Sequence, residues 1–267
     1  MGVTLAGNPI HAVLFDWAGT TVDHGSLAPV RAFSEAFRTL GVPITDAEAR
    51  GPMGRAKRDH IAQILAVPRV QEVWRRTHGR EPAEADVDAL YQRFLPLQKE
   101  VLSRHCDVIA GVPEVVAWLR QQGVRIGSST GYTAELMQVV VPLARAGGYD
   151  PEVMVCTDDV PAGRPAPWLN FLAAQRLGVY PLSQVVVVDD TAVGLAAGRN
   201  AGAITVGVAR TGNALGMTAV EVQLLPVAEL QRRLREIHAA FREAGADYVI
   251  DSVGELRQVL EGNGGAG

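Results

Sequence analysis

The fold is decided by the stretch Val13-Leu14-Phe15-Asp16-Trp17-Ala18-Gly19-Thr20-Thr21-Val22-Asp23. Residues 10–15 are nearly all apolar and predict a short buried strand that stops at an acidic residue, Asp16. A polar turn of one glycine and two threonines follows. Ligands bind at the carboxyl ends of strands in open α/β sheets. A carboxylate there can act as a nucleophile toward phosphorus or as a metal ligand, although a single one more often only caps a turn.

The composition describes a chain that can bury a large core. Hydrophobic residues make up 48% of its 267 residues, which suits one large domain or two modest ones. The net charge is −4 and no basic run with interleaved aromatic residues occurs, so we expect no nucleic-acid partner. No apolar stretch approaches the ~20 residues that cross a bilayer. The first Lys or Arg is Arg31, so the N-terminal residues lack the charged start of a signal peptide. We therefore expect a cytoplasmic protein without a membrane partner.

Lysine is rare in this chain. Of the 25 residues that are Lys or Arg, only Lys57 and Lys99 are lysine. Nucleotide bias in the source genome would explain such a skew. An amine nevertheless performs chemistry that a guanidinium cannot, so the retained lysines are a mild indication of amine chemistry.

The chain divides into a helical stretch and an alternating α/β stretch. Residues 24–104 carry apolar side chains at helical spacing and predict an all-helical domain. Around it, residues 1–23 and 105–267 predict a doubly wound parallel sheet with helices on both faces. We therefore expect an α/β catalytic core with an inserted helical cap above the carboxyl end of the first strand. The predicted strands are residues 10–15, 124–128, 153–156, 185–188, 204–208 and 248–250.

Reactive side chains follow four of these predicted strands. Asp16 follows the first, and residues 128–132 offer hydroxyls and a helix start that suits a phosphate. Residues 157–159 with Arg164 follow the third, and residues 189–191 follow the fourth. Helix capping or solvation explains each group alone. Because the four loops share one edge of a sheet, together they predict a site.

The chemistry of this set suits phosphoryl transfer. Asp16 and Asp190 offer the oxygen ligands that Mg²⁺ prefers. Arg164 and Thr130 would neutralise and orient a phosphoryl group. The set predicts an aspartyl-phosphate intermediate.

These motifs resemble those of the haloacid dehalogenase superfamily and, within it, the phosphonatase family. The similar segments are Phe15-Asp16-Trp17-Ala18-Gly19-Thr20-Thr21-Val22-Asp23, Pro52-Met53-Gly54-x-x-Lys57-x-x-His60, Ser129-Thr130-Gly131-Tyr132, residues 158–168 and Arg199-Asn200-Ala201-Gly202. The resemblance covers nearly the whole chain. It implies a Rossmannoid core, hydrolysis of the phosphorus–carbon bond of phosphonoacetaldehyde during phosphonate degradation, and a homodimer.

The resemblance also implies a role for each matching residue. Asp16 would be the nucleophile and Lys57 would form a Schiff base with the small-molecule phosphonate substrate. Mg²⁺ would be held by Asp16, the backbone carbonyl of Ala18 and Asp190. The expected substrate- and phosphate-binding residues are Thr130, Gly131, Tyr132 and Arg164.

A lysine fits the chemistry of phosphorus–carbon cleavage. The bond would expel a carbanion, whereas an imine formed with Lys57 accepts the electron pair. Lys57 must be neutral to attack, and burial under the cap or the charges of Arg55 and Arg58 would lower its pKa. If residues 53–60 are helical, Met53, Lys57 and His60 share one face. His60 would then move protons and Met53 would shield the amine.

Two departures from phosphatase patterns bear on the function. Ala18 stands where phosphatases usually carry an acid that protonates an alkoxide leaving group, which an enamine leaving group does not require. Gly194 stands where many carry a second metal-site acid, and Asp189 is the candidate substitute. Two alternatives stay open: a phosphatase or phosphomutase acting on a small phosphate ester, and a catalytically silent protein that binds a phosphorylated ligand.

Overall fold

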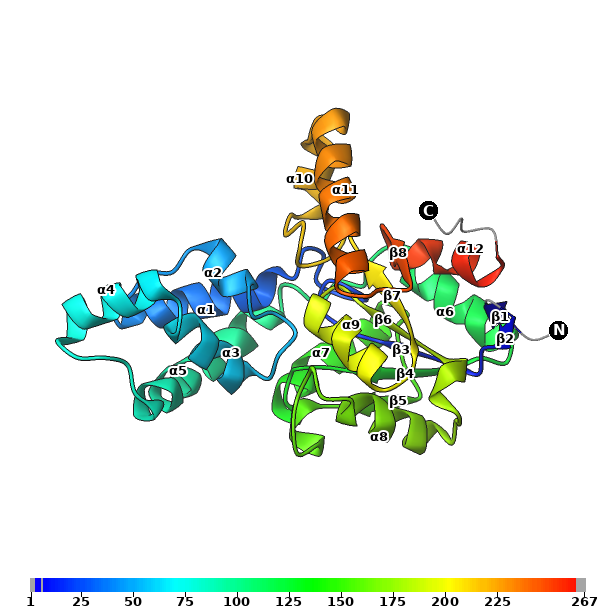
Figure 1. The fold of residues 1–267 in the computed structure, drawn as a ribbon, viewed down its shortest axis with the longest axis horizontal. Helices are drawn as coiled ribbons and strands as arrows, with labels where there is room; N and C mark the ends of the chain where they lie inside the picture. Colours follow the sequence, from blue (N-terminus) through cyan, green and yellow to red (C-terminus); the bar gives the residue numbers. More distant parts are fainter. Residues whose placement is uncertain (1–2, 6, 263–267) are drawn as a thin grey trace.

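A six-stranded parallel sheet is the centre of the structure, a computed structural model that describes residues 3–5 and 7–262 (Figure 1). The strand order is β5-β4-β3-β6-β7-β8, and every neighbouring pair is parallel. This confirms the predicted doubly wound sheet. The strands are β3 (Ala12–Phe15), β4 (Arg125–Ser129), β5 (Val153–Val155), β6 (Val185–Asp189), β7 (Ile204–Val208) and β8 (Tyr248–Ile250).

Both faces of the sheet are covered by helices. Val13 and Val186 pack on one face with α6 (Val112–Gln121), α7 (Ala134–Ala146) and α12 (Leu256–Leu260). Their neighbours Leu14 and Val187 pack on the other face with α8 (Trp168–Leu177), and α9 (Ala192–Asn200) also contacts Val187. Alternate residues of one strand therefore enter two separate apolar layers. That is why the β6 sequence shows no polar alternation.

Five helices form a separate body beside the sheet (Figure 1). They enclose a hydrophobic cluster of their own that includes Phe33, Phe37, Trp74 and Phe94. The helices are α1 (Leu27–Thr39), α2 (Asp46–Arg50), α3 (Lys57–Leu65), α4 (Pro68–His78) and α5 (Glu84–Leu102). We call this body the cap. The domain boundaries at residues 24 and 104 stay a prediction.

The two chain crossings between core and cap lie side by side. The Asp23 carboxylate accepts hydrogen bonds from the backbone N–H groups of Leu27 and Ala28, at 3.1 and 3.0 Å, and so caps α1. His105, on the returning chain, has its Nδ1 3.5 Å from the same carboxylate. One acidic side chain thus begins the cap and contacts its exit.

Residues 53–60 are not one helix, so the condition for a face shared by Met53, Lys57 and His60 is not met: α3 begins only at Lys57. Gly54 has φ +92°, a left-handed conformation that interrupts a helix. A Cβ on Gly54 would lie 2.5 Å from Thr191 Oγ1, so this turn touches the core closely. Met53 therefore lies in a turn and not on the helix face of Lys57.

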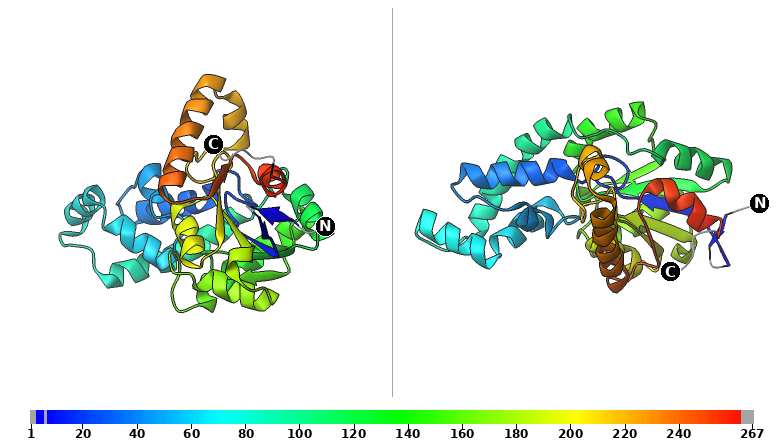
Figure 2. Two further views of the ribbon diagram at one scale, coloured as in Figure 1. Left: turned by 45° about the vertical axis from the view of Figure 1, so that its right-hand side comes forward. Right: turned by 90° about the horizontal axis from the view of Figure 1, so that it is seen from above.

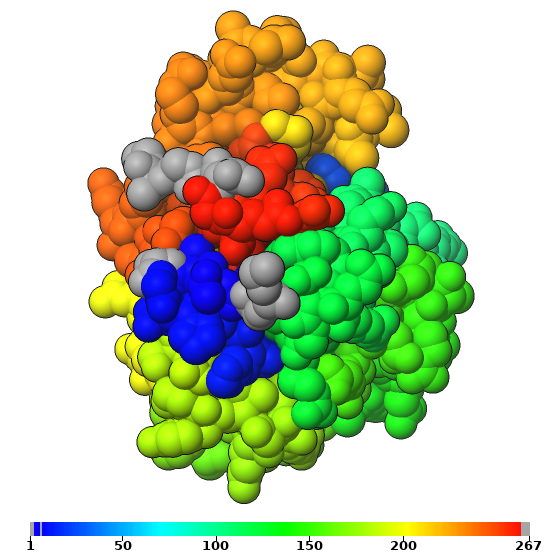
Figure 3. Space-filling model, turned by 90° about the vertical axis from the view of Figure 1, so that its right-hand side faces the viewer, coloured from blue at the N-terminus to red at the C-terminus, as the bar shows by residue number. Residues whose placement is uncertain are grey.

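Two features of the core were not predicted. The short strands β1 (Thr4–Leu5) and β2 (Asn8–Pro9) pair antiparallel, and they lie near α12 at the end of the molecule away from the cap (Figure 3). The helix α10 (Ala219–Leu224) joins the predicted long helix α11 (Val227–Glu243), and the two project from the body (Figure 2). Among the helices of the described residues, none has both the length and the apolar character to span a bilayer.

Candidate active site

The site lies at the carboxyl ends of β3 and β6, where the strand order reverses direction. Phe15 pairs with Val188, so Asp16 and Asp189 leave the sheet side by side. The Asp16 N–H donates to the Val188 carbonyl at 2.9 Å. Such a switch point leaves a crevice above the sheet. Two of the predicted polar loops are thereby brought together.

Arg164 joins three of these loops. Its Nη1 donates to Asp16 Oδ1 at 2.7 Å and lies 3.1 Å from Asp189 Oδ2. Its Nη2 donates to the carbonyl and the hydroxyl of Ser129, each at 2.9 Å. The guanidinium is buried. It is therefore fixed directly beside the Asp16 carboxylate.

Asp190 is positioned by the first loop and by the loop after β7. Its Oδ2 accepts from the Asn213 N–H at 2.7 Å, and the Thr20 hydroxyl lies 3.4 Å from its Oδ1. A Cβ on Gly19 would lie 2.1 Å from Asp190 Oδ2, and Gly19 has φ +88°. Glycine is thus required at residue 19 for both space and backbone conformation.

Three buried carboxylates crowd together in this crevice. Oxygen atoms of Asp16, Asp189 and Asp190 lie within 4.8 Å of one another. Burial raises the pKa of Asp16 to about 7, with Arg164 opposing this shift and Asp189 adding to it. Burial and the Asp16 charge also raise the pKa of Asp190 well above its ordinary value. An oxygen-only donor set whose negative charge Arg164 compensates only in part fits a hard divalent cation.

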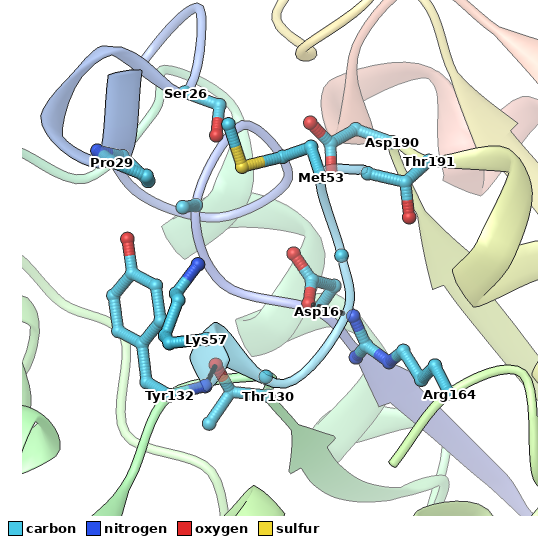
Figure 4. Close-up of a pocket in the computed structure, with 13 residues that line it drawn as sticks. Asp16, Ser26, Pro29, Met53, Lys57, Thr130, Tyr132, Arg164, Asp190 and Thr191 are labelled. Carbon is cyan, nitrogen blue, oxygen red and sulfur yellow. Dashed lines mark hydrogen bonds and ion pairs between the residues drawn. The ribbon is translucent and has the colours of Figure 1, made fainter. Parts of the chain in front are cut away.

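Lys57, the first residue of α3, brings an amine from the cap to this crevice (Figure 4). Its side chain is 3% exposed, and its Nζ lies 4.7 Å from the Tyr132 ring centroid. Burial lowers the pKa of Lys57 to about 7, while the Asp16 charge opposes the shift and Arg164 adds to it. Burial was a predicted cause. Arg58, predicted to act on Lys57, instead pairs with Glu84 and Asp88 at the surface.

The loop after β4 closes one side of the pocket. The Thr130 hydroxyl accepts from the Tyr132 N–H at 3.0 Å, and the Tyr132 hydroxyl accepts from Gln98 Nε2 of the cap at 3.3 Å. A Cβ on Gly131 would lie 2.7 Å from the Arg55 carbonyl oxygen. The core loop and the cap backbone therefore touch at a residue without a side chain.

Met53 and His60 occupy different places. Met53 is buried and lines the pocket with Lys57. His60 lies behind the pocket wall, with Nε2 2.7 Å from the Ala49 carbonyl oxygen and its ring 4.0 Å from that of Phe33, centroid to centroid. Burial, with the Lys57 charge, lowers the pKa of His60 well below its ordinary value. His60 is therefore neutral and its Nε2 is engaged by the backbone.

Most of the predicted site residues share one pocket (Figure 4). Those that line it are Asp16, Ala18, Met53, Lys57, Thr130, Gly131, Tyr132, Arg164 and Asp190. His60 does not line it, and the catalytic roles stay predictions. Asp158 and Asp159 serve local structure, accepting hydrogen bonds from the N–H groups of Ala134 and Cys156.

Some residues of the site were missed from the sequence. Ser26, Pro29 and Gly54 also line the pocket, and Asn213 binds Asp190. The β7 strand was predicted, and its carboxyl end lies at the same edge of the sheet as the other four. Applying the strand-end argument to the loop after β7 would have found Asn213. The other three follow from cap placement, which no local pattern reveals.

Comparisons with known proteins agree with this architecture. The model of the haloacid dehalogenase-like hydrolase family matches residues 10–202. A phosphonoacetaldehyde hydrolase of Bacillus cytotoxicus is 47% identical over 252 residues, which are 94% of this chain and 96% of that protein. One of Paraburkholderia phytofirmans is 47% identical over 94% of each chain.

Solved structures show the same fold. A phosphonoacetaldehyde hydrolase-like protein of Oleispira antarctica superimposes with a TM-score of 0.94 at 38% identity, covering 99% of this chain and 95% of the other. A hydrolase of Pseudomonas syringae superimposes with a TM-score of 0.67 at 19% identity, covering 94% and 98% of the two chains. The second likeness concerns the fold alone.

Proposed function

The chain belongs to the haloacid dehalogenase-like hydrolases and, within them, to the phosphonoacetaldehyde hydrolase family, and we propose that it cleaves phosphonoacetaldehyde through a Lys57 imine and an Asp16 aspartyl phosphate. The products are acetaldehyde and phosphate. One observation carries this mechanism. A buried lysine with a pKa of about 7 and a strand-end aspartate line the same pocket.

The first step joins Lys57 to the aldehyde. The neutral amine attacks the carbonyl carbon, the resulting carbinolamine takes up one proton from solvent, water leaves, and a protonated imine forms. With a pKa of about 7, roughly half of the Lys57 amines are neutral at pH 7, whereas an ordinary lysine is almost fully charged. Met53 at the pocket wall shields this amine from water. The proton-shuttle role of His60 stays a prediction. Its Nε2 is hydrogen-bonded to the Ala49 carbonyl oxygen.

The second step transfers the phosphoryl group. An Asp16 oxygen attacks phosphorus, the phosphorus–carbon bond breaks, and its electron pair enters the imine to give an enamine. Arg164, fixed at 2.7 Å from Asp16, faces the charge of the transferring group, and Thr130 and Gly131 line the same wall. Mg²⁺, held by Asp16, the Ala18 carbonyl and Asp190, would supply further charge stabilisation. No acid is required at residue 18, because an enamine is not an alkoxide.

The remaining steps return the enzyme to its starting state. Water attacks the aspartyl phosphate and releases phosphate and the free Asp16 carboxylate. The enamine takes a proton at its carbon and becomes an imine again. A second water hydrolyses this imine, which releases acetaldehyde and regenerates the Lys57 amine.

Acetaldehyde release from phosphonoacetaldehyde by the wild type and by Lys57→Ala tests the proposal. We expect the variant to lose at least 1000-fold in kcat, at the order of magnitude of removing a covalent catalyst. Borohydride added with substrate should attach a two-carbon adduct to Lys57. The other lysine provides the control: Lys99 is half-exposed and pairs with Glu135, so Lys99→Ala should keep both activity and the adduct.

Three results would overturn the proposal. The imine mechanism is wrong if the wild type is active, no adduct forms and Lys57→Arg keeps full activity. The substrate is wrong if phosphate is released faster from a panel of sugar phosphates than from phosphonoacetaldehyde. Binding of phosphorylated compounds without turnover would instead favour the silent protein.

A further inference from the structure

Asp189 is a buried carboxylate that the mechanism above does not use. It ends β6, directly before Asp190. Its Oδ1 accepts from the N–H and the hydroxyl of Thr191, at 2.9 and 2.7 Å. Its Oδ2 lies 3.1 Å from Arg164 Nη1. Both oxygens are therefore engaged by protein groups.

Gly194 makes room for this carboxylate. The residue lies in the first turn of α9, where a helical glycine costs about 1 kcal/mol relative to alanine. A Cβ on Gly194 would lie 2.0 Å from both Cγ and Oδ2 of Asp189 and 2.2 Å from Oδ1. Real Cβ atoms do not approach so closely, so a side chain at 194 would force the Asp189 carboxylate out of its observed position. Space, and not backbone freedom, explains this glycine.

The same guanidinium nitrogen serves Asp189 and Asp16. Arg164 Nη1 donates to Asp16 Oδ1 at 2.7 Å, while Nη2 is held by Ser129. Asp189 therefore draws the guanidinium toward β6 and divides its charge between two carboxylates. Without Asp189, Asp16 would be the only carboxylate paired with Arg164 in the described structure, and a tighter pair would weaken Asp16 as a nucleophile.

We propose that Asp189 is a positioning residue that holds Arg164 for phosphoryl binding, and that Gly194 is the glycine which makes this carboxylate possible. Both Asp189 oxygens accept from Thr191 and Arg164, so the carboxylate is held where it can position the guanidinium. The inference rests on the proposed function for the group that Arg164 meets. The contact between Asp189 and Arg164 would position the guanidinium for any phosphoryl ligand that enters the pocket.

The first test compares Asp189→Ala and Asp189→Asn with the wild type. We expect kcat on phosphonoacetaldehyde to fall about 10- to 100-fold, as is typical of groups that orient others in a site. The Kd of inorganic phosphate, measured by calorimetry with Mg²⁺ present, should rise about tenfold. The Kd of Mg²⁺ alone should change less than threefold. Asp150→Ala, which breaks an exposed ion pair with Arg145, is the matched control.

The second test uses the steric exclusion between residues 189 and 194. Gly194→Ala should lower phosphate affinity about as much as Asp189→Ala, because the methyl group displaces the carboxylate. In the Asp189→Ala background the same methyl enters vacant space and should cost less than twofold more. The exchange Asp189→Gly with Gly194→Asp brings a carboxylate back into this space and should restore kcat to within about fivefold of wild type.

Several outcomes would overturn the inference. A loss of Mg²⁺ affinity above tenfold in Asp189→Asn would make Asp189 a metal ligand. Unchanged phosphate affinity in Asp189→Ala would contradict the positioning role. If the fold-losses of Asp189→Ala and Gly194→Ala multiply in the double variant, the two residues are not coupled. Circular dichroism identifies a variant that fails to fold, and Asp189→Asn, which keeps the shape, then decides. A wild type that binds phosphate without cleaving phosphonoacetaldehyde refutes the proposed function, while the binding measurements still test Asp189.

Discussion

Lys57 shows how burial changes the chemistry of one side chain. Only 3% of its surface is exposed, and burial lowers the pKa of its amine from 10.5 to about 7. The cation form loses hydration in this pocket, and the Asp16 charge restores only part of the loss. The residue is therefore an amine nucleophile near neutral pH.

The pH dependence of imine formation follows from this shift. A base with a pKa of about 7 is about one-tenth neutral at pH 6, half at pH 7 and nine-tenths at pH 8. We expect the rate of borohydride-trapped adduct formation, at saturating Mg²⁺, to rise through this range and then level off. Lys57→Ala should give no adduct at any pH. A rise centred above pH 9 would mean that the amine keeps an ordinary pKa.

At the scale of elements, α2 ties the cap to the loop that positions Asp190. Arg50 ends α2, and its Nη1 donates to the Gly25 carbonyl at 2.8 Å and to Asn213 Oδ1 at 3.1 Å. Its Nη2 donates to the Gly216 carbonyl at 3.0 Å. Asn213 in turn donates its N–H to Asp190. A helix end in the cap is thus two hydrogen bonds from a predicted metal ligand.

Removing the hydrogen bonds of the Arg50 side chain should weaken metal binding at Asp190. We expect Arg50→Ala to weaken Mg²⁺ binding about tenfold, because the loop loses the guanidinium contacts at Asn213 and Gly216 and keeps only the Asn213 bond to the backbone carbonyl of residue 50. Calorimetric titration with Mg²⁺ measures the effect. Arg69→Ala is the control, because Arg69 pairs with Glu48 inside the cap and touches no core loop. Equal Mg²⁺ affinity in both variants would show that the loop is positioned without the cap.

The elements that the sequence predicted well are those with local signals. Residues 185–188 of β6 are an uninterrupted apolar run. Thr45 with Glu48 three residues later is the sequence pattern of a capping box, and the structure forms that box at the start of α2. The helical geometry considered for residues 53–60 is absent because Gly54 takes a left-handed conformation and lies close to Thr191. That contact is between cap and core, so no local pattern contains it.

At the scale of the whole molecule, the site is assembled from two bodies with separate cores. Asp16 and Arg164 lie in loops of the core, whereas Lys57 belongs to a cap helix with its own apolar cluster. Strand ends meet by the rules of parallel sheets, so the core half of the site was predictable. The place of His60 behind the pocket wall depends on cap packing, and the homodimer implied by the resemblance stays a prediction.

Asp16 and Lys57 are buried in the pocket, and their shifted pKa values make the free energy of unfolding depend on pH. Burial raises the pKa of Asp16 from 3.8 to about 7, so between about pH 4 and 7 the folded protein binds more protons than the unfolded chain. Its contribution to the free energy of unfolding therefore falls as pH rises through this range. For Lys57, lowered from 10.5 to about 7, the unfolded chain binds more protons between about pH 7 and 10.5, so stability rises there.

The summed contribution of Asp16 and Lys57 to the free energy of unfolding is therefore lowest near pH 7 in the metal-free protein. Mg²⁺ binds ionised carboxylates and stabilises the folded state by mass action, about 2.7 kcal/mol at 100 times its Kd. We therefore expect Mg²⁺ to raise Tm strongly at pH 7 to 8 and little at pH 4 to 5, where Asp16 is protonated. Thermal unfolding in EDTA and in Mg²⁺ measures this, with Asp16→Asn as the control that removes the Asp16 part of the acid-side slope and leaves that of Asp190. A Tm increase of the same size at every pH would mean that the Asp16 and Asp190 carboxylates do not bind the cation.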